Sequence, residues 1–316
     1  MTVTQDVKKI YGQTLHSLMS ADPGIVAVDA DLMRIAGTEC IRDDFPDRYV
    51  NAGIAEQNAV AVAAGMAAMG KTVFVSAFCE FLATRASDQC LDTVCYNELN
   101  VKILGTYAGI SSAINGGTHI SLNDMGVFCS MPGMTGIEPS DGLEMEWAIR
   151  EAAAMDGPVY IRVAKGPLHK IFDRGTRFRL GKGHILSQIP EGFSGGKKVA
   201  VVTGGMTTWR AAEAAEILKR SGLCFTHVHL GCLKPADEEL LARVAESHDV
   251  IVTVDNHSVI GGLGDIVCRA VSAAAPVPVI RLGIEDVFCE GMTEEQLASR
   301  HGISAEAIAE AVSHLL

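Results

Sequence analysis

Three features that mark other classes of protein are missing from this 316-residue sequence. No uninterrupted apolar run approaches the roughly 18 residues that a membrane-spanning helix needs, and the stretch Met1–Lys9 lacks the apolar core of a secretory signal. The nine cysteines are scattered, with no Cys-x-x-Cys pair. Without that spacing we expect reduced, mostly buried thiols rather than a zinc site. These absences predict a cytoplasmic protein.

Positive charge is also scarce. Lys and Arg number 26 against 38 Asp and Glu, which gives a formal net charge of -12. That balance argues against binding to nucleic acid or to an anionic membrane, although it leaves room for a local basic pocket that binds a small anion. The rest of the composition, with 48% hydrophobic and 20% charged residues, is typical of a soluble globular protein.

Apolar strands and helical segments alternate along the chain. Strands are predicted at 25–31, 72–76, 101–107, 158–163, 199–203, 225–229 and 250–255. Helices are predicted at 8–20, 85–97, 143–155 and 208–221. The alternation predicts the α/β class, with two domains that are each a mostly parallel sheet flanked by helices. Because the periodicity fails after Phe172, we place the first domain at 1–175, a linker at 176–197 and the second domain at 198–316.

A single glutamate is prominent in the run Arg48-Tyr-Val-Asn-Ala-Gly-Ile-Ala-Glu56-Gln-Asn58. The segment that follows, Ala59–Ala68, carries no charge, so we expect a helix that is buried on nearly all sides. Glu56 would then lie in the first turn of a buried helix, partly removed from water. Surface glutamates are rarely placed this way, which favours a chemical role over that of a helix-capping surface acid.

Together with Asp47-Arg48-Tyr49, the block Asn51–Asn58 resembles the pyrimidine-binding domain of transketolases, which are thiamine-diphosphate enzymes. The resemblance covers nearly the whole chain and continues through residues 78–89, 105–124, 158–165 and 254–264. It implies that Glu56 pairs with N1′ of the cofactor's aminopyrimidine and favours the 4′-imino tautomer. It also implies that the second half is the family's C-terminal domain, which mainly supports dimerisation.

The resemblance implies further cofactor contacts. Phe78 and Phe81 match aromatic residues that stack on the aminopyrimidine, although two phenylalanines at this spacing are also common in ordinary cores. Asp31 matches a position near the cofactor across the subunit interface, but Asp29 and Asp31 are equally consistent with plain acids at a strand end. Ile110 is expected to pack on the cofactor.

One motif of the family is absent. Transketolases bind the cofactor's diphosphate and its Mg²⁺ through Gly-Asp-Gly and a later Asn, and this sequence contains no Gly-Asp-Gly. We therefore expect no metal ligand in this chain. A separate N-terminal transketolase subunit with the Gly-Asp-Gly…Asn motif would anchor the diphosphate and the metal ion. The chain would then be active only as one half of a split transketolase, with an α2β2 assembly as the expected form.

The substrate residues follow from the same resemblance. His119 matches a histidine that contacts the substrate's carbonyl and hydroxyl region, and a loop histidine bonded to the backbone is the plainer alternative. Tyr107 and Asn115 stand where sugar-phosphate transketolases have His and Asp. Lys165 replaces an Arg, which keeps the charge but loses the planar fork that suits a phosphate. Arg34 could supply another cation.

We therefore expect transfer of a two-carbon ketol unit from a ketose to an aldose. The departures at the substrate positions favour an unusual anionic sugar, such as a branched ketose phosphate or a sulfonated ketose. Two alternatives stay open. One is the β subunit of the E1 component of a 2-oxo-acid dehydrogenase, which has a similar size and a glutamate in the same role. The other is a non-catalytic partner subunit, which the retention of Glu56 disfavours.

Overall fold

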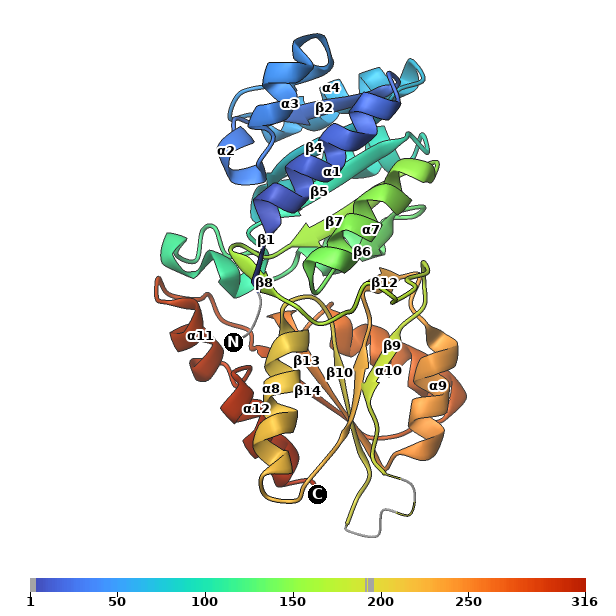
Figure 1. The fold of residues 1–316 in the computed structure, drawn as a ribbon, viewed down its shortest axis with the longest axis vertical. Helices are drawn as coiled ribbons and strands as arrows, with labels where there is room; N and C mark the ends of the chain where they lie inside the picture. The colour runs from blue at the N-terminus through green and yellow to red at the C-terminus, as the bar shows by residue number, and fades with distance from the viewer. Residues whose placement is uncertain (1–3, 191, 193–195) are drawn as a thin grey trace.

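The structure is a computed structural model, and it describes residues 4–190, 192 and 196–316. Two α/β domains lie one above the other in Figure 1, the first coloured blue to green and the second yellow to red. Each domain has a central sheet with helices on both faces. The predicted fold class is confirmed.

The sheet of the first domain has the strand order β12-β6-β7-β5-β4-β2-β3. All neighbouring strands are parallel except β12, which runs antiparallel to β6. The strands are β2 (Ile25–Asp29), β3 (Tyr49–Asn51), β4 (Thr72–Phe78), β5 (Val101–Thr106), β6 (Thr135–Ile137), β7 (Val159–Val163) and β12 (Cys232–Lys234). Because β12 belongs to the second half of the chain, the two domains share this sheet edge.

Helices cover both faces of this sheet. One face carries α1 (Val7–Ala21), α2 (Met33–Ala36), α3 (Glu39–Asp44) and α7 (Gly142–Ala154), with η1 (Pro46–Arg48) following α3. The other face carries α4 (Glu56–Ala68), α5 (Cys79–Thr84), the π-helical turn η2 (Gln89–Cys95) and α6 (Asp124–Ser130). Within the described residues, no helix is both long and apolar enough to cross a membrane.

The predicted helix at 85–97 differs from the structure, which has α5 before it and the π-helical turn η2 inside it. Ala86, Cys90 and Val94 are fully buried. These residues form the buried face of this segment, and such π turns are often found at functional sites. The short helix α5 ends at Thr84, and Arg85 follows it with right-handed helical dihedral angles.

The second domain has the strand order β14-β13-β10-β11-β9. Its strands are β9 (His184–Ser187), β10 (Val199–Thr203), β11 (Thr226–His229), β13 (Val250–Ser258) and β14 (Val279–Ile284). Its helices are α8 (Thr207–Lys219), α9 (Glu238–Ser247), α10 (Leu263–Ala274), α11 (Glu294–Arg300) and α12 (Ala305–Ser313). Apolar residues of α8, α11 and α12 fill one face, and those of α9 and α10 fill the other.

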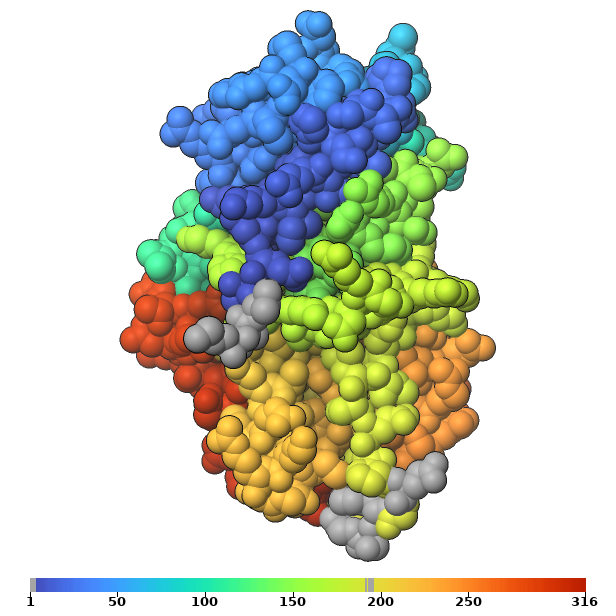
Figure 2. All heavy atoms as spheres, viewed as in Figure 1, coloured from blue at the N-terminus to red at the C-terminus, as the bar shows by residue number. Residues whose placement is uncertain are grey.

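The predicted linker at 176–197 is not wholly irregular, because β9 lies inside it and pairs antiparallel with β11. The burial of β9 alternates residue by residue, as expected for an edge strand that is covered on one side. Residues 191 and 193–195 of that linker lie outside the described residues. The segment after β8 (Pro167–His169) is yellow-green in Figure 2, and it lies across the front of the junction between the domains. Strand β8 pairs antiparallel with β1 (Thr4–Asp6).

Candidate active site

Most of the predicted site residues lie at one edge of the first sheet. Parallel strands of this sheet end together there, so residues far apart in the sequence become neighbours. The residues at or just after the strand ends are Asp31, Asn51, Phe78, Tyr107 and Lys165. In open α/β sheets, ligands bind at this carboxyl edge.

Four ring side chains form one cluster at this edge. The ring centroid of Phe78 lies 4.8 Å from that of Tyr107 and 5.8 Å from that of Phe81. The His119 ring lies 5.2 Å from Phe81 and 6.1 Å from Phe78. All four pairs meet edge to face, which is a favourable arrangement for aromatic rings. Residues that the sequence assigned to the cofactor and to the substrate therefore share one cluster.

Glu56 is the first residue of α4, and only 2% of its surface is exposed. The helix behind it is rich in alanine and packs tightly, with Ala59 and Ala63 fully buried. A carboxylate so far from water needs a partner, and its Oε2 atom accepts a hydrogen bond of 2.7 Å from Nη1 of Arg85. Its second oxygen, Oε1, makes no hydrogen bond with any residue that the structure describes. One oxygen of the buried carboxylate is therefore left for a ligand.

Asp31 follows β2 in a backbone conformation that is uncommon for residues other than glycine, with φ of 62°. Two hydrogen bonds hold it there. Its backbone N–H donates to Oδ1 of Asn51 at 3.1 Å, and Nδ2 of Asn51 donates to Oδ1 of Asp31 at 2.9 Å. Residues held in sparsely populated conformations cluster at ligand-binding sites, so this geometry favours a functional reading of Asp31 over that of a plain strand-end acid.

Tyr107 has a similar conformation, with φ of 65°, directly after β5. Burial raises the pKa of its hydroxyl, and Nζ of Lys165 lies 4.7 Å from the centroid of its ring. Lys165 also lines a cavity of about 380 Å³ beside His169 and Trp209, whose rings stack at 4.1 Å. Its ammonium group forms no ion pair with the acids in the described part of the chain. An available cation therefore borders the aromatic cluster.

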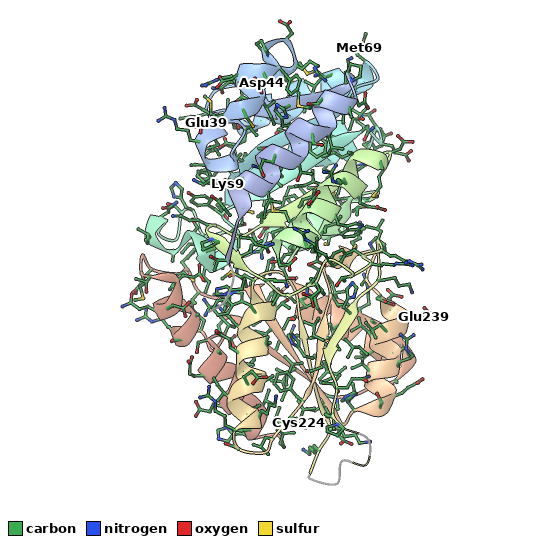
Figure 3. All side chains as sticks on the ribbon, viewed as in Figure 1. Lys9, Glu39, Asp44, Met69, Cys224 and Glu239 are labelled. Carbon is green, nitrogen blue, oxygen red and sulfur yellow. The ribbon has the colours of Figure 1, made fainter. Side chains whose placement is uncertain are left out.

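Four predicted site residues have no contact with the ring cluster in the described structure, and Asp31, which is hydrogen-bonded to Asn51, is one of them. Arg34, Asn115 and Ile110 are the others. The side chain of Arg34 is 88% exposed and lies 3.5 Å from Glu39, which Figure 3 shows at the outer margin of the first domain. Asn115 is exposed at the end of η3 (Gly109–Asn115). Ile110 is fully buried in the core of the second domain, where its N–H donates to Oδ1 of Asn256 at 2.8 Å. The packing of Ile110 on a cofactor stays a prediction.

Sequence reasoning missed Arg85. Besides its bond to Glu56, its guanidinium carbon lies 4.5 Å from the centroid of the Phe81 ring. A sequence signal was present, because a cation four residues after a predicted stacking aromatic lies one helical turn away on the same face. Glu80 was also missed. It lines a second cavity, of about 250 Å³, together with Gly117, and burial raises its pKa to about 7.

The residues at this edge fit the pyrimidine half of thiamine diphosphate. Aromatic rings can contact a flat heterocycle, and a buried carboxylate with one unbonded oxygen can pair with a ring nitrogen. For the metal ion, the described residues contain no group of three or more His, Cys, Asp and Glu side chains that could hold one.

Two protein-family models match most of the chain. The model described as "Transketolase, pyrimidine binding domain" matches residues 3–170, and "Transketolase, C-terminal domain" matches residues 193–308. The chain is 36% identical over 305 residues to the 6-deoxy-6-sulfo-D-fructose transketolase subunit SqwH of a Clostridium species, with coverage of 96% of this chain and 92% of that subunit. It is 32% identical to an apulose-4-phosphate transketolase subunit of Phocaeicola vulgatus, with coverage of 95% and 94%.

Longer relatives and solved structures agree. The chain is 33% identical to the transketolase of Homo sapiens over 98% of its own length, but it spans only 49% of that enzyme. A structure described as a split gene transketolase, inactive β4 tetramer, has 36% identity and a TM-score of 0.88 over 99% of this chain and 98% of that one. The transketolase of Campylobacter jejuni has the same fold at 18% identity, with a TM-score of 0.80 over 99% of this chain and 47% of that one. The chain therefore belongs to the transketolase family and corresponds to its pyrimidine-binding and C-terminal domains.

Proposed function

We propose that this chain is one half of a split transketolase that transfers a two-carbon ketol unit from an anionic ketose to an aldose. The observation that carries the proposal is Glu56, a buried carboxylate beside a cluster of aromatic rings, with one oxygen that accepts no hydrogen bond from the described residues. When bound, thiamine diphosphate supplies the electron sink for cleavage of the ketose C2–C3 bond. The diphosphate and Mg²⁺ would be held mainly by a separate N-terminal subunit with the Gly-Asp-Gly…Asn motif.

Each residue of the cluster has a distinct proposed task. Glu56 holds a proton between its carboxylate and N1′ of the aminopyrimidine, while Phe78 and Phe81 bind the ring and keep water from it. His119 donates hydrogen bonds to the substrate's oxygens and can move a proton among them. The Lys165 ammonium binds the anionic end of the sugar.

The proposed substrate class rests on two supports. Tyr107 and Lys165 replace the His and Arg expected for a common sugar phosphate, which removes a bidentate phosphate contact. Two relatives of nearly equal length are described as acting on 6-deoxy-6-sulfo-D-fructose and on apulose 4-phosphate. We infer that a sulfonated or branched ketose is the donor. The reduced, unpaired cysteines favour a cytoplasmic location.

Reconstitution tests the function. The chain is purified with an N-terminal transketolase subunit that carries the Gly-Asp-Gly…Asn motif, thiamine diphosphate and Mg²⁺ are added, and ketol transfer is measured with xylulose 5-phosphate, 6-deoxy-6-sulfo-D-fructose and apulose 4-phosphate. We expect transfer from one of the two unusual donors, an α2β2 mass, and no transfer by this chain alone. Decarboxylation of pyruvate in place of ketol transfer would establish the E1 alternative. Binding of the N-terminal subunit without any turnover would establish the non-catalytic alternative.

A further inference from the structure

One arginine connects the two parts of the proposed cofactor pocket. Arg85 donates from Nη1 to Oε2 of Glu56 at 2.7 Å, and the same guanidinium group lies over the ring of Phe81 at 4.5 Å. Glu56 is on α4, whereas Arg85 and Phe81 are on or next to α5. A single side chain therefore contacts both the predicted proton partner of the cofactor and one wall of its slot.

The pair is unequal in its exposure to water. The side chain of Arg85 is 47% exposed, whereas that of Glu56 is 2% exposed. An exposed ion pair contributes little to the free energy of unfolding, because water solvates both charges well when they separate. Here only the carboxylate has lost its water, so Arg85 is the group that compensates a buried negative charge.

Only one oxygen of the Glu56 carboxylate accepts a hydrogen bond from the described residues. Arg85 contacts Oε2 alone, and Oε1 has no hydrogen-bond partner among the described residues. A guanidinium group is planar and can donate to a carboxylate while it lies on an aromatic ring, which an ammonium group cannot do with the same geometry. Arg85 thus restrains the rotation of the Glu56 carboxylate and leaves its second oxygen to a ligand.

We propose that Arg85 is a positioning residue for Glu56. It orients the carboxylate so that the oxygen without a described hydrogen-bond partner pairs with N1′ of the aminopyrimidine. The proposal rests on the proposed function, because it concerns the same pocket, and it adds a residue that the sequence analysis did not assign to the site.

The test compares two arginines that differ in the burial of their partners. R85M removes the charge but keeps much of the length of the side chain, and R85K keeps the charge but loses the planar fork. R150M is the matched control, because Arg150 is 45% exposed and pairs at 2.9 Å with Glu146, which is itself 46% exposed. Each variant is reconstituted with the N-terminal subunit, and thiamine diphosphate is titrated at saturating Mg²⁺ with intrinsic fluorescence as the readout. Circular dichroism of the bound aminopyrimidine is recorded in parallel.

We expect R85M to weaken thiamine diphosphate binding about tenfold, the usual scale of coupling between residues in contact. The dichroism band of the bound aminopyrimidine should change, because N1′ loses a fixed partner. R85K should restore part of the affinity, and R150M should match the wild type. The double variant E56Q/R85M leaves no buried charge unpaired, and it should bind the cofactor no more weakly than E56Q alone.

Two results overturn the role of Arg85. One is unchanged affinity and dichroism for R85M with only a lower melting temperature, which would make the ion pair purely structural. The other is tighter binding by R85M, which would make Arg85 a blocking group. Both leave the proposed function intact when the wild-type complex binds thiamine diphosphate and E56Q weakens that binding. Failure of the wild-type complex to bind the cofactor overturns the proposed function and the role of Arg85 together.

Discussion

Two arginine–carboxylate sites in this chain show opposite designs. Arg162, on β7, is fully buried and donates to Asp124 at 2.8 and 3.1 Å and to Glu138 at 2.6 Å. It also donates to the backbone carbonyls of Ser121 and Asn256. Arg85 is half exposed, and its one hydrogen bond to a described residue goes to Glu56. At the first site, the hydrogen bonds of the buried charges are made within one chain. At the second site, one carboxylate oxygen accepts no hydrogen bond from the described residues.

The two sites differ because one stabilises the fold and the other can bind a ligand. Arg162 connects the first domain to the backbone of Asn256 in the second, so its hydrogen bonds fix the junction. Burial opposes the ionisation of Asp124, but the charge and hydrogen bonds of Arg162 outweigh it and lower the pKa of that carboxyl. A saturated buried network like this has no capacity for a ligand. An unsaturated buried carboxylate has that capacity, so substitutions at the two sites should differ in kind.

The largest effect is expected for E56Q. An amide cannot act as the proton partner of N1′, so ketol transfer by the reconstituted complex should fall by about 10²–10⁴-fold, the usual contribution of such a group. Stability should change little, because the amide still accepts a hydrogen bond from Arg85. Steady-state kinetics and thermal unfolding measure the two effects, with E146Q on the exposed face of α7 as the control. Activity within a few-fold of the wild type would show that Glu56 is not the proton partner.

The second largest effect is expected for R162M, and on stability rather than chemistry. Asp124 and Glu138 would be left buried without a compensating charge, which costs about 3–5 kcal/mol of unfolding free energy. Urea unfolding of the isolated chain measures this loss. R150M should cost less than about 1 kcal/mol, because its ion pair is exposed. Equal losses of unfolding free energy in R162M and R150M would show that the buried network of Arg162 stabilises the fold no more than an exposed ion pair.

A third prediction concerns a buried acid that has no cation beside it in the described structure. Asp29 is 1% exposed, and burial raises its pKa from 3.8 to about 6. Between those values the folded chain keeps a proton that the unfolded chain releases, so stability is lost as pH rises through this window and stays lower above it. An asparagine side chain carries no such charge, so D29N should gain up to about 3 kcal/mol over the wild type as pH rises from about 4 to about 8.

Chemical unfolding at several pH values measures the gain from D29N. The matched comparison is D124N, whose parent carboxyl has a lowered pKa and should lose rather than gain relative stability as pH rises from acid to neutral. A difference between D29N and the wild type that is independent of pH would contradict the prediction.

The sequence was sufficient to predict structure and site residues where the pattern involves residues that are close together in the chain. Val199–Thr203 is a continuous apolar run, and it forms the buried strand β10 because both faces of a parallel sheet are covered. Glu56 could be singled out because the uncharged helix behind it follows at once. The edge strand β9 was missed, because four alternating residues amid glycines and charges are too weak a pattern to distinguish from a loop.

Long-range contacts account for the other differences. Ile110 is buried against the second domain, where Oδ1 of Asn256, 146 residues later, accepts its N–H, and the sequence analysis did not predict that contact. Arg85 follows α5 and reaches Glu56, at the start of α4, across 29 residues of sequence. Strand β12 joins the first sheet from the second half of the chain, which no local pattern indicates. Such contacts depend on the packing of the whole chain.

The smallest expected effect is on substrate affinity. The Lys165 ammonium lies over the Tyr107 ring and makes no ion pair with the described acids, so it resembles the Glu56 site in keeping a charge available. K165M should raise KM for an anionic ketose by about tenfold, the loss of one charged hydrogen bond, and leave kcat nearly unchanged. K170M is the control, because Lys170 already pairs with Asp173 at 2.6 Å. K165R should lower KM selectively for phosphorylated ketoses, since the guanidinium fork suits phosphate. Equal KM changes in K165M and K170M would show that Lys165 does not contact the sugar.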